Sequence, residues 1–495
     1  MNHIYYKSTR DNDINVLASE AILKGISDDG GLFIPEKMPE LDFDIKDIVN
    51  MSYKEIAYKV MKGFFTDFTE EELKYCIENA YDSKFDTEEI APIKKTKDAY
   101  FLELYHGPTL AFKDMALSIL PYLLKTASKK NGIEDKIVIL TATSGDTGKA
   151  ALEGFKDVPG TEIIVFFPSD GVSEVQRLQM VTQNGKNTHV VAIDGNFDDA
   201  QSGVKKIFTD KEFIKELKDN NCVFSSANSI NIGRLVPQVV YYFYAYAKMC
   251  SKDEIKFGEK INFVVPTGNF GNILAAYFAK NMGVPVNKLI CASNDNKVLY
   301  DFFESGSYDK NREFVTTISP SMDILISSNL ERLIYFICDR DSNKVVKFMK
   351  ELSENGVYNI SEEMKDKLKD FYGGYATEGE TKKAIDKVYS ENKYLIDTHT
   401  AVAYSVYEDY LNSTKDTLKT VIASTASPYK FTNAVMTSLH DKYTSVDDFE
   451  LMKKMSELIG SEIPSGVKNL NEREVIHKNV CKKDEMKEIV RGFLK

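Results

Sequence analysis

The sequence lacks the patterns that mark disulfide scaffolds, zinc sites and membrane spans. Its six cysteines are scattered and none forms a CxxC pair, so neither a disulfide framework nor a zinc centre is expected, and a reducing compartment fits. No apolar run approaches the roughly 18 residues that a membrane helix requires. The N-terminal stretch MNHIYYKSTRDND is polar and has no secretory apolar core. We therefore expect a cytoplasmic protein with no membrane partner.

Excess basic charge is also absent. The 495 residues include 63 Lys and Arg against 75 Asp and Glu, which gives a net charge of −12. This balance argues against nucleic acid as a partner, although it leaves room for a local basic pocket that binds a small anion. The six histidines show no HExxH or other paired spacing, so we expect no metal site.

Three common catalytic motifs are missing from the glycine-containing loops. None of these loops reads GxxxxGK[ST] or GxGxxG, which argues against a nucleotide-binding site of either usual kind. No GxSxG elbow is present, which makes serine hydrolase chemistry a poor candidate. The chemistry must therefore come from other residues.

The length of the chain predicts several domains, because a single simple core does not grow to 495 residues. Residues 1–90 form a first unit with a Gly-rich turn followed by helical patterns. In TEEELKYCIENAY, Thr69 and Glu72 give the Thr-x-x-Glu signature of a helix start. We expect a mostly helical N-terminal domain.

The remaining chain divides by its periodicity. Strand-like and helical runs alternate over residues 91–330, which indicates an α/β core in two lobes with a largely parallel sheet. Residues 331–395 show helical patterns without strand runs, which predicts a helical insertion. TVIASTASPYKF, within 396–440, returns to the core, and the charged stretch 441–495 is expected to be helical.

Two loops share one design, in which a buried strand runs into a glycine turn before a helix. They are residues 143–148, TSGDTG, and residues 268–272, GNFGN. Glycines let the backbone approach a ligand, and a helix N-terminus attracts anions. Each loop alone is also compatible with a tight connection, but two in one fold favour a bound anionic ligand. Lys149 follows the first loop, where it either meets that anion or leans into solvent.

One lysine stands at the start of an apolar helix in HGPTLAFKDMAL. Lys113 is either a snorkelling surface residue, half of an ion pair, or a reactive amine. A desolvated lysine next to anion-binding loops has the ingredients of a Schiff-base enzyme, and pyridoxal phosphate would use both features. A sugar-phosphate or other anion-binding enzyme remains the alternative at this point. The roles of His106 and Asp114, structural or chemical, stay open.

Four motifs in this order resemble threonine synthases, in particular the longer class of fungi and many bacteria: HGPTLAFKD, TSGDTGKAA, SSANSINIGRLVPQ and PTGNFGN. The stretches YYKSTRDND and GISDDGGLFIPE resemble the N-terminal domain of that class. The resemblance extends from about residue 4 to about residue 431. It implies an α/β fold of the tryptophan-synthase-β type, which is the two-domain pyridoxal-phosphate fold type II.

The resemblance also implies site residues. Lys113 would form the Schiff base with the cofactor, and Thr425 would face the pyridine nitrogen. The cofactor phosphate would lie in a cradle made by Gly268, Asn269, Phe270, Gly271 and Asn272. The substrate carboxylate and the cofactor ring oxygen would meet Ser144, Asp146 and Thr147. Two departures from the family pattern are Asn272, where some relatives have Asp, and Ser427, where relatives often have His.

The implied reaction converts O-phospho-L-homoserine and water to L-threonine and phosphate, the last step of threonine biosynthesis. Lys149 and Arg234 are candidates for the substrate phosphate, with a surface or ion-pair arginine as the less favoured alternative for Arg234. Alternatives are a related lyase (a phosphohomoserine phospho-lyase or a serine/threonine dehydratase) and a catalytically silent binding protein. The resemblance favours a monomer, with a dimer as the alternative.

Overall fold

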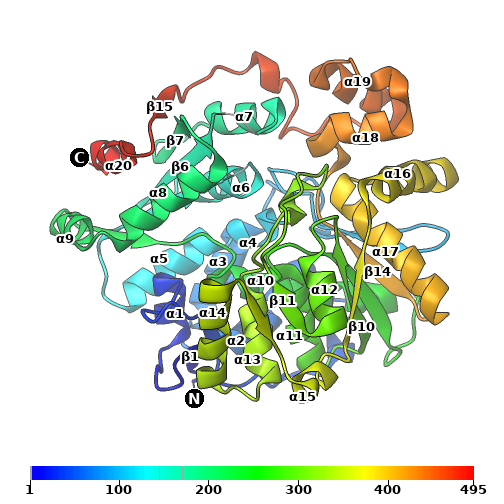
Figure 1. The fold of residues 1–495 in the computed structure, drawn as a ribbon, viewed down its shortest axis with the longest axis horizontal. Helices are drawn as coiled ribbons and strands as arrows, with labels where there is room; N and C mark the ends of the chain where they lie inside the picture. The colour runs from blue at the N-terminus through cyan, green and yellow to red at the C-terminus, as the bar shows by residue number, and fades with distance from the viewer. Residues whose placement is uncertain (1–2, 144, 170–171, 495) are drawn as a thin grey trace.

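Two largely parallel β-sheets form the centre of the protein, in a computed structural model that describes residues 3–143, 145–169 and 172–494 (Figure 1). The larger sheet has the order β13 (Phe371–Tyr375), β10 (Val286–Ser293), β9 (Ile261–Pro266), β14 (Thr420–Ser424), β4 (Tyr100–Glu103) and β3 (Ile93–Lys95). The smaller has the order β15 (Asn479–Cys481), β7 (Thr188–Ile193), β6 (Thr161–Pro168), β5 (Lys136–Ala142) and β8 (Cys222–Ser225). Among the described strands of both sheets, β3 is antiparallel to its neighbour and the other pairs are parallel.

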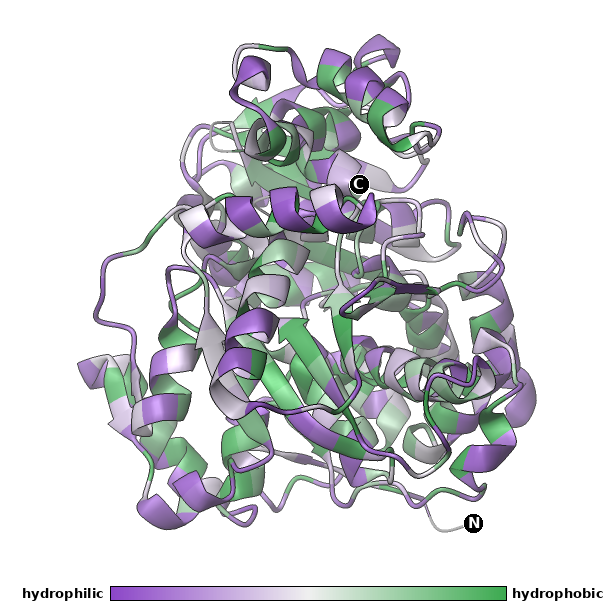
Figure 2. Ribbon diagram, turned by 90° about the vertical axis from the view of Figure 1, so that its right-hand side faces the viewer, coloured by the Kyte–Doolittle hydropathy of each residue, from purple (hydrophilic) through white to green (hydrophobic). Residues whose placement is uncertain are grey.

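The inner strands of the smaller sheet, β5 and β6, are largely buried on both faces, because helices cover the sheet on each side. Along β5, Ile137 and Ile139 belong to the main core, while Val138 and Leu140 belong to a second core under α8, α9 and α20. This alternation follows from the two-residue period of a strand. Figure 2 shows the apolar strands at the interior and polar colour on the outer sides of the surrounding helices.

The N-terminal unit is mostly helical, as predicted. It contains α1 (Ala18–Lys24), α2 (Tyr53–Phe64) and α3 (Glu70–Ala80), beside the antiparallel pair β1 (Tyr6–Ser8) and β2 (Phe33–Pro35). Thr69 and Glu72 form the expected capping box at the start of α3, and Ser52 and Glu55 form another at α2. These boxes satisfy backbone N–H groups that a helix start leaves free.

The remaining helices flank the two sheets (Figure 1). They are α4 (Asp114–Leu117), α5 (Leu120–Lys130), α6 (Asp146–Phe155), α7 (Glu174–Val181), α8 (Phe197–Thr209), α9 (Lys211–Asp219), α10 (Ile232–Ser251), α11 (Gly271–Asn281), α12 (Val298–Ser305), α13 (Leu330–Ile337), α14 (Ser342–Asn355), α15 (Glu362–Asp366), α16 (Glu378–Asn392), α17 (Thr398–Thr414), α18 (Thr432–Leu439), α19 (Asp448–Ile459) and α20 (Met486–Leu494). Within the described ranges, none of the helices has the length and apolar character to cross a bilayer.

Two segments contain strands that their sequence patterns did not predict. Residues 331–395 are mostly helical, as expected, but β13 extends the larger sheet and β12 (Val357–Asn359) pairs with β11 (Ser307–Asp309). Residues 441–495 likewise include β15 at the edge of the smaller sheet. Both strands that join the main sheets lie at an edge, so sheet pairing decides their conformation more than local periodicity does.

A buried arginine ties the N-terminal unit to the core. Arg332, fully buried at the start of α13, donates from Nε to the carbonyl of Phe33 (3.0 Å) and from Nη2 to the carbonyl of Ile230 (2.6 Å). Its Nη1 donates to the side-chain oxygen of Asn329. Beside it, Arg10 donates to both carboxylate oxygens of Glu331, at 2.9 and 2.8 Å. The first 80 residues are therefore bonded to the segment that faces the glycine loop.

Candidate active site around Lys113

The turn before α4 fixes the place of Lys113. The carboxylate of Asp114 accepts hydrogen bonds from the amide and the hydroxyl of Thr109, at 2.8 and 2.6 Å. Gly107 packs against this carboxylate, since a Cβ there would lie 2.5 Å from Asp114 Cβ. The amide of Phe112 donates to the carbonyl of Thr425 (2.8 Å), which brings the chain after β14 beside Lys113.

The Lys113 amine is buried and has two hydrogen-bond partners. The residue is 8% exposed, and Nζ lies 3.2 Å from Asp146 Oδ2 and 3.1 Å from Ser321 Oγ. Ser321 Oγ in turn donates to Asp146 Oδ2 at 3.1 Å. Burial lowers the pKa of Lys113, and the positive charges of Lys430 and Arg234 add to that effect while Asp146 opposes it. The unprotonated, nucleophilic form of this amine is therefore more accessible than that of a lysine in water.

Asp146 is the acidic centre of the cluster. Its Oδ1 accepts from Gln176 Nε2 (3.0 Å) and lies 3.1 Å from Lys430 Nζ. Burial would raise the pKa of this carboxyl, but the charges of Lys113 and Lys430 outweigh burial and hold the pKa well below its usual range. Asp146 therefore stays ionised between two lysine amines.

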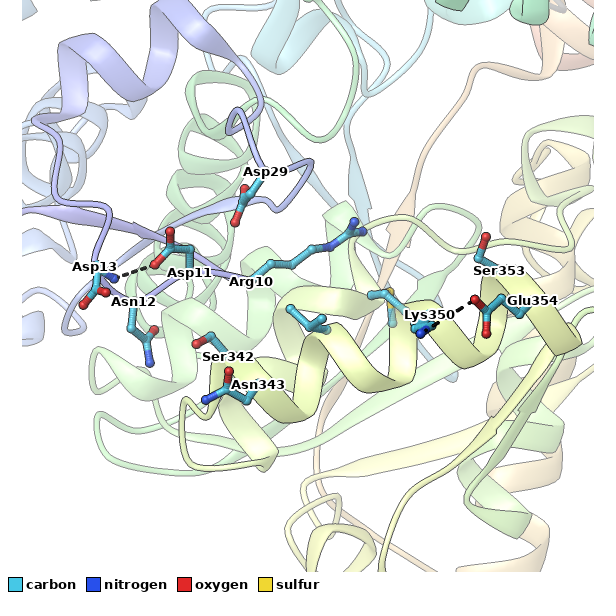
Figure 3. A pocket seen from close by; sticks show the side chains of 12 residues that line it. Arg10, Asp11, Asn12, Asp13, Asp29, Ser342, Asn343, Lys350, Ser353 and Glu354 are labelled. Carbon is cyan, nitrogen blue, oxygen red and sulfur yellow. Dashed lines mark hydrogen bonds and ion pairs between the residues drawn. The ribbon is translucent and has the colours of Figure 1, made fainter.

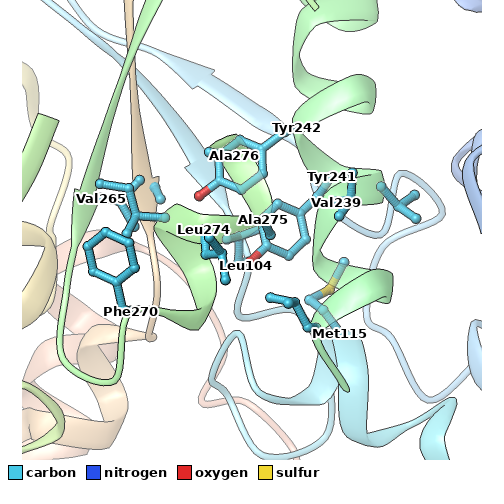
Figure 4. Packing of buried hydrophobic residues seen from close by; sticks show 14 of the residues in the cluster. Leu104, Met115, Val239, Tyr241, Tyr242, Val265, Phe270, Leu274, Ala275 and Ala276 are labelled. Atoms are coloured by element: carbon cyan, nitrogen blue, oxygen red, sulfur yellow. The ribbon is translucent and has the colours of Figure 1, made fainter. Parts of the chain in front are cut away.

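The predicted cradle, residues 268–272, forms the turn between β9 and α11. Phe270 adopts a left-handed conformation (φ 63°) as the N-cap of α11, and Gly268 lies so close to Ser321 that a Cβ would come within 2.4 Å of its carbonyl oxygen. Asn272 accepts hydrogen bonds from Tyr241 and Tyr242, the latter at 2.7 Å. Figure 4 shows Phe270, Tyr241 and Tyr242 within the buried packing around this turn.

Two side-chain nitrogens near these elements are buried without a partner among the described residues: Asn272 Nδ2 and Arg234 Nε. The Arg234 guanidinium is 4% exposed and donates from Nη1 to the carbonyl of Ala227 (2.8 Å). Burial lowers the pKa of Arg234 to about 10, against a smaller opposing effect from Tyr241. Unpaired buried donors carry a free-energy cost of about 1–3 kcal/mol each, which an anionic ligand would relieve.

The remaining residues of the first predicted loop differ in their surroundings. Lys149 Nζ lies 3.2 Å from Glu153 and also contacts Gln183, so its position in the first turn of α6 is compensated from within the protein. Thr147 is half-buried in the same turn, one residue after Asp146. Ser144 lies outside the described residues. The open question about Asp114 is settled in part, since it holds the turn before α4.

His106 points to a different set of groups. Its ring nitrogens lie 3.0 Å from Glu103 and 2.5 Å from Asp86. Burial would lower the pKa of His106, but these two carboxylates outweigh burial and raise the pKa to about 9.

Ser427, at the position where relatives often have His, caps a short 3-10 turn (Pro428–Phe431) and donates its amide to the carbonyl of Leu110 (3.0 Å).

Sequence reasoning missed four residues that surround Lys113 and Asp146. They are Gln176, Ser321, His399 and Lys430. Lys430 lies in a segment already suspected to rejoin the core, so its burial could have been proposed from SPYKF. Ser321 carries no comparable signal, because it lies 208 residues from Lys113, in a short 3-10 turn (Pro320–Met322).

A surface cavity of about 730 Å³ lies elsewhere, between the N-terminal unit and α14 (Figure 3). Arg10, Asp11, Asp13 and Asp29 line one side, and α14 supplies Lys350 and Glu354 on the other. None of its lining residues belongs to the Lys113 cluster. It carries charges of both signs, two of which, Lys350 and Glu354, form an ion pair at 3.9 Å.

Three family models match successive parts of the chain. Residues 5–81 match the threonine synthase N terminus, residues 88–423 match the pyridoxal-phosphate dependent enzymes, and residues 400–481 match the threonine synthase C-terminal model. The threonine synthase of Schizosaccharomyces pombe is 36% identical over 88% of this chain and 89% of its own length. The chain belongs to the threonine synthase family of pyridoxal-phosphate-dependent enzymes.

Solved threonine synthase structures agree with this family assignment. A pyridoxal-phosphate-bound threonine synthase from Brucella melitensis superposes with a TM-score of 0.88 and 35% identity, covering 99% of this chain and 100% of that chain. The yeast threonine synthase gives a TM-score of 0.88 at 33% identity, over 99% of this chain and 98% of that one. The predicted two-domain α/β fold of pyridoxal-phosphate enzymes is thereby confirmed.

Some relatives are much longer than this chain. The proteins named threonine synthase-like 1 from Macaca fascicularis and Homo sapiens are 38% and 39% identical over 89% and 86% of this chain. The matched chain spans only 60% and 58% of their lengths. Membership of the threonine synthase family thus fixes the fold and the cofactor class, while the activity is argued from the site.

Proposed function

We propose that this threonine synthase family member is a lyase that converts O-phospho-L-homoserine and water to L-threonine and phosphate. One observation carries the proposal: the buried Lys113 amine, with its lowered pKa, lies where the carboxyl ends of strands from both sheets meet beside the Gly268–Asn272 turn. Ligands of open α/β sheets bind at such strand ends. A reactive amine and an anion-binding turn at one place are what this chemistry requires.

The residues present fit pyridoxal 5'-phosphate. The close approach of Gly268 to Ser321 leaves no room for a side chain, so the turn is shaped by bare backbone. The unpaired Asn272 Nδ2 offers a donor to a phosphate, and the N-terminus of α11 adds a positive dipole end. Lys113 would hold the cofactor aldehyde covalently, Gly268 to Asn272 its phosphate, and Thr425 its ring nitrogen.

When bound, the cofactor supplies an electron sink for charge that develops on the substrate carbons. The free amine of Lys113 would be the group that moves protons at Cα and Cβ of the substrate. Phosphate leaves from Cγ, that carbon gains a proton, and water adds at Cβ. A neutral hydroxyl from Thr425 would leave the ring nitrogen less protonated than a carboxylate partner would.

The substrate carries a phosphate and a carboxylate, and the cluster offers unequal partners for them. Arg234 has a free buried donor, whereas Lys149 is already bonded to Glu153 and Gln183, so Arg234 is the stronger candidate for the phosphate. The ionised Asp146 would repel the substrate carboxylate. Thr147 is the better donor in that loop, with Ser144 beside it in the sequence.

Three further expectations accompany this proposal. The protein acts as a monomer in the cytoplasm, with a dimer as the alternative. The N-terminal unit (1–90), the core (91–330 and 396–440), the mostly helical insertion (331–395) and the C-terminal segment (441–495) act as structural units of one enzyme. Each of these stays a prediction.

Product analysis tests the proposal directly. The protein is incubated with pyridoxal phosphate and O-phospho-L-homoserine, and phosphate and threonine are measured together. Equal amounts of both support the assignment, while ammonia with 2-oxobutanoate identifies a related lyase and overturns it. Lys113→Ala is expected to abolish turnover; turnover that persists in this variant removes Lys113 from the chemistry.

A further inference from the structure

Lys113 Nζ, Ser321 Oγ and Asp146 Oδ2 form a closed triangle. The three separations are 3.1, 3.1 and 3.2 Å, and the three groups come from the N-cap of α4, from the segment before α13 and from α6. The Ser321 hydroxyl has one proton, which it gives to the carboxylate, so its oxygen accepts from the amine. Asp146 and Ser321 therefore provide two acceptors for Lys113.

Two acceptors match an unprotonated amine. A neutral lysine has two N–H donors and one lone pair, so both donors are satisfied and the lone pair is left over. A protonated lysine would have a third N–H, for which this triangle offers no partner. The arrangement holds the amine with its lone pair turned away from Asp146 and Ser321.

Ser321 is itself held by a second buried pair. Its backbone N–H donates to Nε2 of His399 at 3.1 Å, and Nδ1 of His399 lies 2.7 Å from Oδ2 of the fully buried Asp397. Since Nε2 accepts, Nδ1 must carry the proton and donate to Asp397, which fixes one tautomer of the ring. Asp397 also caps α17 through the amides of His399 and Thr400, at 2.9 and 3.1 Å, so the pair is anchored in a 17-residue helix.

We propose that Ser321 is a positioning residue for the free Lys113 amine, and that the Asp397–His399 pair holds Ser321 in place for this task. The Ser321 carbonyl also packs against Gly268, so one residue sets the distance between the reactive amine and the glycine turn. The inference rests on the proposed function only in taking Lys113 as the reactive amine. The segment that contains Ser321 carries none of the sequence motifs described above.

The test measures amine reactivity in the full-length protein without the cofactor. Lys113 is methylated with formaldehyde and cyanoborohydride across a range of pH, and its peptide is quantified by mass spectrometry. Ser321→Ala is expected to lower the limiting rate at high pH about tenfold, the effect of losing one hydrogen bond of about 1.4 kcal/mol. Ser319→Ala is the matched control, because Ser319 is buried in the same segment and bonds Asn294 (3.1 Å) instead of the amine.

Variants of His399 provide an independent test, because they leave the Ser321 hydroxyl in place. His399→Phe removes the acceptor for the Ser321 amide and is expected to reproduce the loss, whereas His399→Gln supplies an amide oxygen and should restore most of the rate. Ser321→Cys, with a weaker hydrogen bond at similar volume, is measured in case the alanine variant does not fold. Limiting rates within twofold of Ser319→Ala in all these variants would overturn the inference.

The outcome is separate from that of the proposed function. Reactivity of Lys113 that depends on Ser321 supports the positioning role even if no threonine is formed. In the active enzyme, Ser321→Ala should lower kcat with little change in KM, because Lys113 moves protons after the substrate is bound. A rise in KM with kcat unchanged would instead contradict the positioning of the amine.

Discussion

The carboxylate of Asp146 joins two lysines that are 317 residues apart in the sequence but adjacent in space: Oδ2 lies 3.2 Å from Lys113 Nζ and Oδ1 lies 3.1 Å from Lys430 Nζ. Neither amine has access to bulk water, since the side chains are 9% and 0% exposed. One negative charge thus serves two amines, and the amine of Lys113 can lose its proton without leaving Asp146 unpaired.

Removing the second lysine should change the titration of the first. Lys430→Met deletes a positive charge that lowers the pKa of Lys113, so this pKa should rise. The variant should also lose about 3 kcal/mol of stability, because Asp146 keeps only one cationic partner. The pH dependence of Lys113 methylation and urea unfolding measure the two effects. Lys453→Met, an exposed lysine of α19, is the control and should change neither.

A methyl group at Gly268 should disturb the cofactor site. In Gly268→Ala the new Cβ would lie 2.4 Å from the backbone oxygen of Ser321, so the turn or the Ser321 segment must shift. We expect pyridoxal-phosphate affinity to fall at least about tenfold, since one misplaced phosphate donor corresponds to roughly 1.4 kcal/mol or more. Titration of the cofactor by absorbance measures this. Gly379→Ala in α16, where nothing lies within 4 Å, should bind as the unaltered protein does.

His106 should make stability depend on pH on the alkaline side. Its pKa is raised from 6.5 to about 9, so its protonated form is stabilised in the folded state. The contribution is fully present below pH 6.5 and is lost as the pH rises through 9. It amounts to about 3 kcal/mol at most. His106→Gln should remove this dependence between pH 6.5 and 9.5, as measured by urea unfolding; an unchanged slope would contradict the pairing with Asp86 and Glu103.

The C-terminal helix should contribute to the core despite its charged sequence. Met486 is 1% exposed and packs against Gly203 of α8. Met486→Ala should cost about 2–4 kcal/mol, because it leaves a cavity in the second core. Lys483→Ala removes an exposed side chain with one ion pair to Asp199 and should cost under about 1 kcal/mol. Thermal and urea unfolding compare the two variants.

The sequence predicted the parts of the fold and site that local patterns encode. Thr69 and Glu72 mark the start of α3, KIVILTA marks β5, and the residues of GNFGN and HGPTLAFKD mark the two sides of the site. These signals are local because caps, buried strands and glycine turns depend on residues a few positions apart.

The partners of Lys113 were not predictable in the same way. Ser321 reaches the amine across 208 residues, and His399 acts on Ser321 from another helix, so only tertiary packing brings them together. For Lys149, the sequence suggested a ligand where the structure shows a partner within the protein. Its place in the first turn of α6 suggested a bound anion, but Glu153, four residues later, supplies the negative charge from the same helix. Edge strands such as β13 and β15 were missed because pairing, not period, defines them.

The contacts of Arg332 give the N-terminal unit a part in ligand binding. This guanidinium bonds Phe33 on one side and Asn329 on the other, and Asn329 donates from its amide and its side chain to the carbonyl of Asn269, each at 3.0 Å. Because these contacts link the two regions, a ligand that stabilises the turn at Asn269 should also stabilise the first strands of the chain. Cofactor binding should therefore stabilise the N-terminal unit. Residues 5–81 should become more resistant to proteolysis when pyridoxal phosphate is bound.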